Sequence, residues 1–170
     1  EGRYILGLEK RELDSSGMIE LLTGWIERYP IVSIEDPLGE DDTEPFRAFT
    51  DKFGDTVQII GDDFLVTSSE RIHAAAEAGI CNSALIKPNQ AGTITETKAA
   101  LDAAKDVGWG TVISARSGET EDITIAHLAV GWNAGQLKVG SFARSERMAK
   151  WNEVLRIEEA LGDKARLAGT

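Results

Sequence analysis

The chain has 170 residues, of which 42% are hydrophobic and 28% charged, and its formal net charge is -11. Such a composition is that of an ordinary globular protein, and the length suits one domain spanning residues 1–170. A negative net charge without a compensating basic block disfavours binding to nucleic-acid phosphates or to an anionic membrane surface. We therefore expect small molecules or proteins as partners.

Cysteine usage and hydropathy favour a cytoplasmic protein. Cys81 is the sole cysteine, so no internal disulfide can form, which is typical of a reducing compartment. No basic and apolar leader begins the sequence. The most apolar stretch, 123–137, is interrupted by a histidine, polar amides and glycines, so we expect no membrane-spanning segment.

Short β-branched runs alternate with longer amphipathic segments. A helix is predicted at 16–28, followed by strands at 31–34, 57–60, 84–86, 111–114 and 137–140, with helices between and after them at 43–53, 67–78, 93–107, 120–132 and 143–161. Two of these helices begin with a capping-box pattern, Thr67 with Glu70 and Thr93 with Glu96. Because the strands are nearly all apolar, they are typical of a covered parallel sheet, and the fold class is α/β.

Polar residues at the strand ends separate a barrel from an open doubly wound sheet. They are spaced 27, 25, 29 and 22 residues apart and follow successive strands: Glu35, Asp62, Lys87, Arg116 and Lys138. In a (β/α) barrel such strand ends converge on one face, whereas an open sheet spreads them along a line. We therefore predict a partial TIM-type barrel. Five strands cannot close a ring of eight, so we expect the N-terminal part of the barrel to be missing.

Carboxylates at neighbouring strand ends predict a Mg²⁺ site. Glu35 and Asp36 end one strand and Asp62 and Asp63 the next, and carboxylate oxygens are the ligands that Mg²⁺ prefers. The alternative is that some of these acids cap the following helices or pair with lysine and arginine. We expect that role for Asp36 or Asp63.

Two lysines are candidates for chemistry. Lys87 follows a fully apolar run, so its ammonium should be partly desolvated, which makes a neutral amine and a role as a general base accessible. The alternative is that Lys87 simply pairs with Asp62. Lys138 offers a second cation from across the ring. Two lysines opposite a carboxylate cluster suit a substrate that has a carboxylate beside an abstractable proton.

A glycine-containing turn predicts an anion site. Arg116 and Ser117 lie on the turn expected to open the helix near Thr120, where free N–H groups, the helix dipole and a guanidinium favour phosphate. The alternative is that the acids of this segment, Glu119, Glu121 and Asp122, serve only the helix N-terminus.

Five linked motifs give the chain a clear resemblance to the enolase family, from Gly2 to Gly169: "YPIVSIEDPLGEDD", "QIIGDDFLVT", "LIKPNQAGTITET", "SARSGETED" and "GQLKVGSFARSERMAKWNEVLRIEEALGD". The resemblance implies roles for six residues: Glu35 and Asp62 bind Mg²⁺, Lys87 abstracts the C2 proton, Arg116 and Ser117 bind phosphate, and Lys138 holds the substrate. It also implies that the complete protein dehydrates 2-phosphoglycerate to phosphoenolpyruvate in glycolysis and forms a homodimer. The family's third metal carboxylate and the acid for the leaving hydroxide belong to sequence preceding Glu1, so we expect the chain alone to be inactive.

Ala115 is a departure from the family pattern at the predicted site. The family usually has histidine where this chain has Ala115, so an imidazole contact to the substrate is lost. Two alternatives to an ordinary enolase therefore remain open. One is a lyase of the same superfamily that acts on another phosphorylated or phosphonate carboxylate, and the other is a protein-binding scaffold that has lost catalysis.

Overall fold

The computed structural model describes residues 2–169. It begins with an antiparallel hairpin of β1 (Arg3–Leu6) and β2 (Arg11–Asp14). A five-stranded parallel sheet follows, built from β3 (Ser33–Glu35), β4 (Gln58–Gly61), β5 (Ser83–Ile86), β6 (Gly110–Ser114) and β7 (Gly135–Lys138). The helices are α1 (Ser15–Arg28), α2 (Thr43–Phe53), α3 (Ser69–Glu77), α4 (Pro88–Ala91), α5 (Ile94–Asp106), α6 (Thr124–Gly131) and α7 (Ser145–Leu161), with a 3-10 turn, η1 (Gly162–Lys164).

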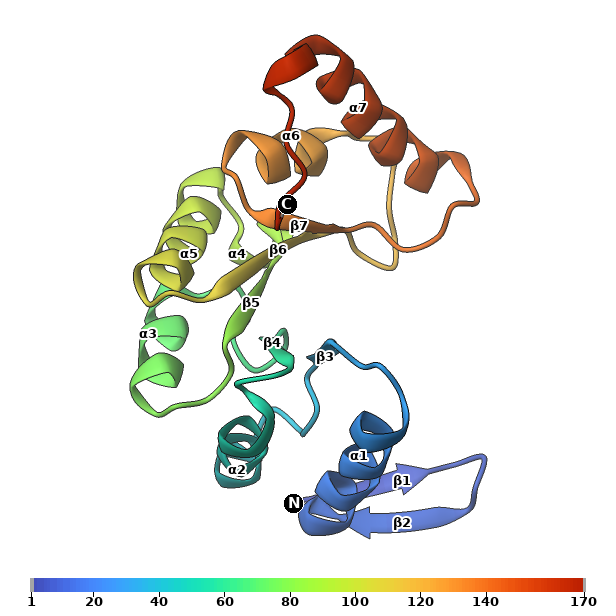
Figure 1. Ribbon diagram of the computed structural model, residues 1–170, viewed down its shortest axis with the longest axis vertical. Coiled ribbons are helices and arrows are strands. Elements are labelled where there is room, and N and C mark those ends of the chain that lie inside the picture. The colour runs from blue at the N-terminus through green and yellow to red at the C-terminus, as the bar shows by residue number, and fades with distance from the viewer. Residues whose placement is uncertain (1, 170) are drawn as a thin grey trace.

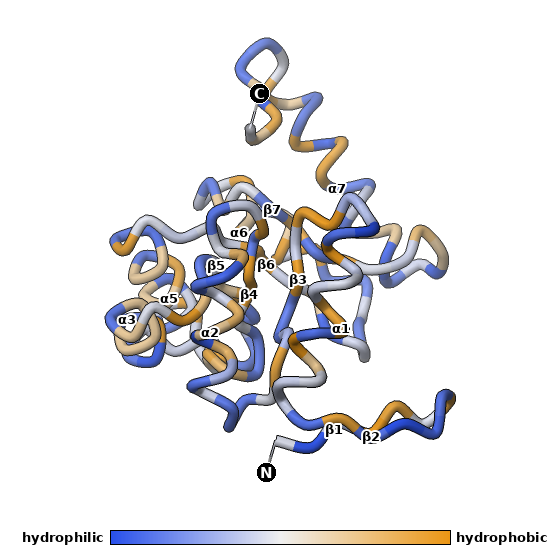
Figure 2. Tube along the Cα trace, turned by 60° about the horizontal axis from the view of Figure 1, so that its bottom comes forward, coloured by the Kyte–Doolittle hydropathy of each residue, from blue (hydrophilic) through white to orange (hydrophobic). Residues whose placement is uncertain are grey.

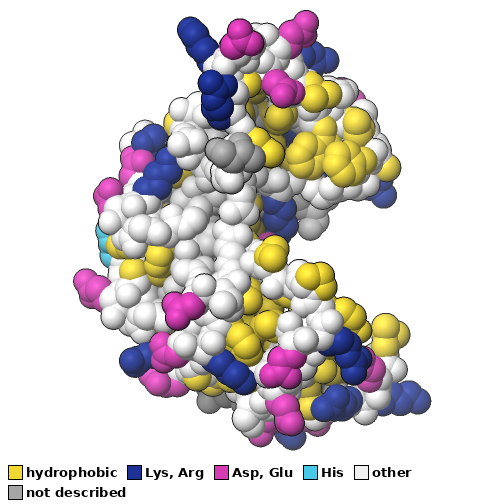
Figure 3. All heavy atoms as spheres, viewed as in Figure 1, with side chains coloured by type: hydrophobic (Ala, Val, Ile, Leu, Met, Phe, Trp, Pro, Cys, Tyr) yellow, Lys and Arg dark blue, Asp and Glu magenta, His cyan; other side chains and the backbone are white. Residues whose placement is uncertain are grey.

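The strand order in the sheet is β3-β4-β5-β6-β7, the same as the order along the chain. All four pairings are parallel, and the sheet curls with its helices on the convex side, so that the ribbon has the form of part of a barrel (Figure 1). The prediction of a partial TIM-type barrel is confirmed. The space-filling view shows the molecule hollowed between the part built from α6 and α7 and the part built from α1 and the hairpin (Figure 3).

Side chains of the strands alternate between two apolar clusters. The larger cluster lies between the sheet and the helices and includes Ile59, Ile86 and Ile113. The smaller cluster is made of one residue from each central strand, Ile60, Leu85 and Val112, on the concave face. Because side chains alternate along a strand, residues two positions beyond these three also lie on the concave face.

The covered-sheet prediction holds for the central strands and fails for the edges. Every residue of β5 is buried, and β4 and β6 each have only one residue that is not. β3 and β7 are mostly half-buried or exposed, since each has a neighbour on one side only. Both edge strands are also displaced from the predicted ranges. The sheet hydrogen bond from the Gln58 N–H to the Val32 carbonyl nevertheless extends one residue before β3.

The helices follow their apolar periodicity. α2 buries Phe46, Phe49 and Phe53, which fall on one face of the helix and pack against the sheet. The N-cap half of the capping box predicted at Thr93 is confirmed, because the Thr93 hydroxyl accepts a hydrogen bond from the Glu96 N–H at 3.1 Å. The Glu96 carboxylate accepts from the same hydroxyl at 2.8 Å. In residues 2–169 no helix has the length and apolar character needed to cross a membrane.

The predicted capping box at Thr67 is wrong. Ser68 is the N-cap of α3, and its hydroxyl accepts from the Arg71 N–H. Thr67 has a left-handed backbone with φ of 54°, and its side chain turns away from the helix toward β5. The predicted range for this helix was therefore two residues too long at its start.

The hairpin lies apart from the parallel sheet and packs beside α1 (Figure 2). Tyr4 connects it to the loop that follows β3, because its hydroxyl donates to Asp42 Oδ2 at 2.5 Å and accepts from the Gly39 N–H. Burial and the neighbouring Asp42 carboxylate raise the pKa of Tyr4. The hairpin thus helps to fix the loop that leaves the end of β3.

Candidate functional site

The six predicted site residues line one cleft at the C-terminal ends of the strands, with a volume of about 670 Å³. The cleft is lined by Glu35, Asp62, Asp63, Lys87, Ala115, Arg116, Ser117, Lys138, Val139, Gly140, Ser141, Arg144 and Arg147. Strand alternation explains the convergence: Asp62 and Lys87 come two residues after Ile60 and Leu85 of the concave cluster. The structure therefore brings together the residues that the strand-end pattern predicts.

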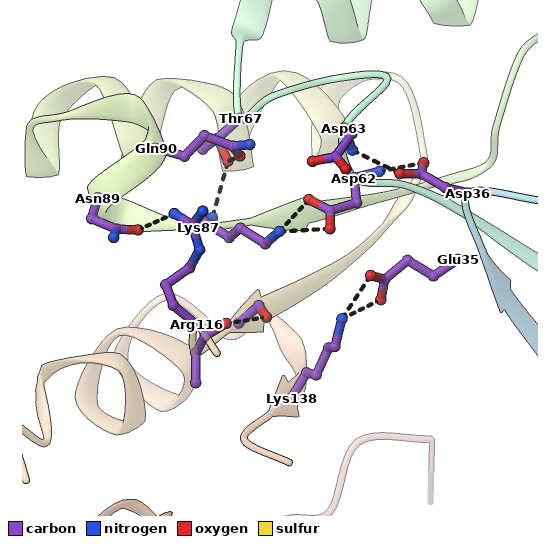
Figure 4. Close-up of polar contacts among 12 residues, drawn as sticks. Glu35, Asp36, Asp62, Asp63, Thr67, Lys87, Asn89, Gln90, Arg116 and Lys138 are labelled. Atoms are coloured by element: carbon purple, nitrogen blue, oxygen red, sulfur yellow. Dashed lines mark hydrogen bonds and ion pairs between the residues drawn. The ribbon is translucent and has the colours of Figure 1, made fainter. Parts of the chain in front are cut away.

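Lys87 and Asp62 both line this cleft and form an ion pair with each other (Figure 4). Lys87 Nζ lies 2.6 Å from Asp62 Oδ2 and 2.5 Å from Oδ1, and the two side chains are 10% and 9% exposed. The pairing that the sequence offered as the alternative role of Lys87 is thus present in the structure. It does not exclude chemistry, because Lys87 also lines the cleft.

Thr67 fixes the backbone of Lys87. The Thr67 hydroxyl accepts the Lys87 N–H at 3.0 Å and donates to Gln90 Oε1 at 2.7 Å. Both Val66 and Thr67 are β-branched and have positive φ angles of 46° and 54°, an unfavourable conformation that surrounding contacts must hold. Nothing in the sequence indicated this role, because Thr67 matched the pattern of a helix cap instead.

Three carboxylates lie together beside the ion pair. Oxygens of Asp36, Asp62 and Asp63 all fall within 4.8 Å of one another. Asp36 accepts the backbone N–H groups of Asp62 and Asp63, each at 2.8 Å. Its carboxylate is therefore used to hold the next strand end, and not to cap a helix or pair with a cation, which was the role predicted for Asp36 or Asp63. Burial raises the pKa of Asp36 despite these two hydrogen bonds.

The donor set fits a divalent cation. Within residues 2–169, Asp62 Oδ1 is the buried side-chain oxygen that lacks a hydrogen bond, although it contacts the Lys87 ammonium. Because Lys87 Nζ lies 2.5 Å from this oxygen, the oxygen becomes available to a hard metal ion only when the ammonium moves away. The second predicted ligand, Glu35, lies outside the group of three aspartates, so its role as a ligand stays a prediction.

A second lysine pair spans the mouth of the curled sheet. Lys138, at the end of β7, places Nζ 2.7 Å from Glu35 Oε1 and 2.5 Å from Oε2, at the end of β3 (Figure 4). The side chains are 47% and 30% exposed, so this pair is far more open to solvent than the pair of Lys87 and Asp62. Lys138 does face the first strand from across the sheet, as predicted.

The turn that carries Arg116 and Ser117 does not open a helix. α6 begins at Thr124, so the helix dipole lies too far along the chain to act on Ser117. Asp122 explains the later start, because its side chain accepts the Thr124 N–H at 2.9 Å. The expectation that an acid serves this helix N-terminus is confirmed for Asp122. The predicted anion site therefore rests on Arg116 and on the backbone of the turn.

Four residues that the sequence did not single out for the site hold this turn. Asn89 Oδ1 accepts from Arg116 Nη1 at 2.6 Å. Glu119, assigned only to the helix terminus, accepts the Arg116 N–H at 2.7 Å. From α7, Arg147 donates to the Arg116 carbonyl at 2.7 Å, and Lys150 contacts Glu119 at 3.0 Å. The spacing of the motifs along the sequence did not predict that residues 143–150, "ARSERMAK", would lie beside the glycine-containing turn.

Comparisons with known proteins agree with this architecture. The family model described as "Enolase, C-terminal TIM barrel domain" matches residues 2–170. The curated protein "Enolase 1" of Desulfitobacterium hafniense (strain Y51) is 55% identical over 165 residues, which are 97% of this chain and 38% of that relative. The chain therefore spans well under half the length of the relative that it matches.

Proposed function

Because the chain belongs to the enolase family, we propose that the complete protein is a phosphopyruvate hydratase, a hydro-lyase that interconverts 2-phosphoglycerate and phosphoenolpyruvate in glycolysis. The observation that carries this proposal is the single cleft in which lysine and arginine side chains meet carboxylates at successive strand ends. A substrate with a phosphate, a carboxylate and an abstractable proton needs this combination of charges.

Lys87 is the proposed base that takes the proton from C2 of the substrate. Its side chain is 10% exposed, so bulk water is largely kept from the transferred proton. Because Nζ contacts Asp62 at 2.5–2.6 Å, this ion pair has to loosen before the amine can accept a proton. The Thr67 hydroxyl supports the step by holding the Lys87 backbone in place.

The other predicted residues bind and orient. Arg116 and Ser117 are proposed to bind the phosphate and Lys138 the carboxylate, while Glu35 and Asp62 are proposed to hold Mg²⁺. When bound, Mg²⁺ supplies positive charge that offsets the negative charge developing on the substrate carboxylate. For Glu35 to be a ligand, its carboxylate has to turn from Lys138, which leaves that lysine free for the substrate.

The setting of the complete protein is proposed on the same basis. We infer a cytoplasmic homodimer whose partners are small molecules, with neither nucleic acid nor membrane among them. Residues 1–170 are taken as one domain, which by itself is inactive because the family's third metal carboxylate and its acid lie outside the matched motifs.

The test uses the complete protein, Mg²⁺ and 2-phosphoglycerate. Dehydration should be detected, and Lys87→Ala should abolish exchange of the C2 proton with solvent while Mg²⁺ binding persists, because the base and the metal ligands are different groups. Lys164→Ala is the matched control, since Lys164 is exposed on η1 and lies outside the cleft. If exchange persists in Lys87→Ala, Lys87 has only a structural role.

Ala115 favours a second candidate, a lyase of the same superfamily that acts on another phosphorylated or phosphonate carboxylate. Ala115 lines the cleft next to Arg116 in the chain, and its N–H donates to the Lys138 carbonyl at 2.9 Å, so it lies between two of the residues proposed to bind the substrate. A scaffold without catalysis is less well supported, because a surface that only binds protein does not need a cluster of unlike charges that is costly to bury.

Ala115→His in the complete protein separates these candidates by the sign of its effect. In an ordinary enolase the imidazole restores a hydrogen bond to a charged group, and kcat/KM for 2-phosphoglycerate should rise by roughly one to two decades. In an enzyme with a changed substrate, the ring fills space that the substrate needs, and turnover should fall. Circular dichroism controls for folding.

A further inference from the structure

The first two turns of α7 contact the turn that carries Arg116 and Ser117. We propose that Glu119, Arg147 and Lys150 are positioning residues that fix the Arg116–Ser117 turn relative to Lys138 and so set the affinity of the site for an anion. The choice of phosphate as the anion rests on the proposed function. The positioning itself rests on the contacts described next.

The backbone N–H and the backbone carbonyl of Arg116 are each hydrogen-bonded by a side chain. Its N–H donates to Glu119 Oε1 at 2.7 Å, and its carbonyl accepts from Arg147 Nη1 at 2.7 Å. Arg147 Nη2 also donates to the Ser117 carbonyl at 2.8 Å. Charge-assisted hydrogen bonds of this length are the stronger class, so the turn cannot shift without breaking several of them.

Arg147 also joins the ends of two strands. Its Nη1 donates to the Val139 carbonyl at 3.0 Å, and Val139 directly follows Lys138. The last sheet bond between β6 and β7 is the one from the Ala115 N–H to the Lys138 carbonyl. One guanidinium therefore continues the connection beyond the sheet and fixes the spacing between the turn and Lys138.

Lys150 forms a buried ion pair with Glu119. The Lys150 side chain is 1% exposed, and Nζ lies 2.8 Å from the Thr120 carbonyl, 2.9 Å from the Glu146 carbonyl and 3.0 Å from Glu119 Oε2. Burial by itself raises the pKa of Glu119, but the Arg116 N–H and the charges of Lys150 and Arg147 outweigh it and lower that pKa. Glu119 thus stays ionised and remains a strong acceptor.

Stability alone does not account for a lysine in this position. A buried ion pair costs much of its attraction in desolvation, and apolar residues of similar size often serve stability as well or better. Lys150 is nevertheless the one described residue of α7 that is fully buried. Because Lys150 lies where α7 contacts the turn, we infer that its ammonium serves to fix the geometry of the turn and not to stabilise the fold.

The experiment compares Arg147→Met and Lys150→Met with wild type in the complete protein. Calorimetry measures the Kd for inorganic phosphate, and steady-state kinetics measure KM and kcat for 2-phosphoglycerate. Displacement of the turn should raise the phosphate Kd and KM together, about tenfold to a hundredfold, with a smaller change in kcat. Arg156→Met is the control on the same helix, because Arg156 is exposed and pairs with Glu153, outside the Arg116–Ser117 turn.

A purely structural role predicts another pattern. It lowers Tm or the fraction of active protein but leaves the phosphate Kd and KM within about twofold of wild type, the usual range for a neutral surface change. That outcome overturns the proposal. If Lys150→Met fails to fold, the double variant Lys150→Met with Glu119→Gln removes both charges and keeps an oxygen that accepts the Arg116 N–H.

The failure of this inference and that of the proposed function are distinguishable. A wild-type protein that does not dehydrate 2-phosphoglycerate, but whose phosphate affinity falls in Arg147→Met, overturns the function and supports the positioning role. If the wild-type protein turns over 2-phosphoglycerate while the variants bind phosphate with wild-type affinity, the function is supported and the positioning role is overturned. Arg147→Lys should give an intermediate Kd, because one ammonium cannot reach all three carbonyls that the guanidinium contacts.

Discussion

Two lysine–carboxylate pairs occupy the same cleft and differ in almost every physical respect. Lys87 and Asp62 follow neighbouring central strands and are about 10% exposed, and both backbones are held by further side chains. Lys138 and Glu35 belong to the two edge strands and are 47% and 30% exposed. The same two kinds of charged group therefore form a buried ion pair in one place and a solvent-exposed ion pair in the other.

The difference shows that the position of a strand in the sheet, central or at the edge, determines how exposed similar ion pairs are. A buried pair that loses one partner leaves an uncompensated charge, whereas an exposed pair loses little because water replaces the partner. The inner pair is thus suited to a task that needs a fixed atom, and the outer pair to one that needs a side chain to change partners. This agrees with a base at Lys87 and a substrate contact at Lys138.

The largest expected effect on stability is the difference between removing the lysine of the buried pair and removing the lysine of the exposed pair. Lys87→Met should lower the free energy of unfolding by about 3–5 kcal/mol because it isolates the Asp62 carboxylate. Lys138→Met should lower it by less than about 1 kcal/mol because its partner is exposed. Urea denaturation of the complete protein measures both.

The control for this prediction removes the isolated charge as well. Lys87→Met combined with Asp62→Leu should recover much of the lost stability, because neither charge then remains buried. Equal losses for Lys87→Met and Lys138→Met would contradict the contrast between the two pairs.

A smaller effect should follow from removing the hydroxyl that holds Lys87. Thr67→Val keeps the β-branched shape, and so the same backbone strain, but takes away the acceptor for the Lys87 N–H and the donor to Gln90. The cost should be about 1–3 kcal/mol in stability, the usual range for a buried polar group left without its partner. Thr67→Ser keeps the hydroxyl and should stay near wild type. A Thr67→Val protein as stable as Thr67→Ser would show that the hydroxyl is dispensable.

The smallest effect concerns a third pair, Lys150 and Glu119, whose acid has a lowered pKa. An acid with a lowered pKa in the folded state adds stability that is present above its ordinary value of 4.5 and is lost as the pH falls through the folded value. Glu119→Gln should therefore flatten the loss of stability below about pH 4.5. Denaturant midpoints of wild type and variant, measured from pH 7 to pH 3, should converge at the acid end. Parallel curves would contradict the prediction.

The sequence predicted the fold and the convergence of the strand ends, because both depend on local patterns. Apolar runs define the strands, and alternation alone places Asp62 and Lys87 on the concave face. The pair of Lys87 and Asp62 was one of two roles that the sequence left open for this lysine, and the structure contains it. The other contacts that hold the strand ends were not predictable, because they depend on backbone geometry that residue type does not specify. Asp36 binds amides of the next strand, and Thr67 adopts a left-handed conformation, although both have residue types that usually cap helices.

The sheet order has a consequence for how the cleft assembles as the chain emerges from the ribosome. Each strand pairs with the strand made just before it, so the sheet can grow by one neighbour at a time without waiting for distant sequence. Lys87 and Asp62 are 25 residues apart and can meet once β5 has formed. Lys138 and Glu35 are 103 residues apart and can meet only after β7 is made, so this contact forms later than the inner pair. The contacts from Arg147 and Lys150 of α7 to the Arg116–Ser117 turn come later still, because α7 follows β7 in the chain.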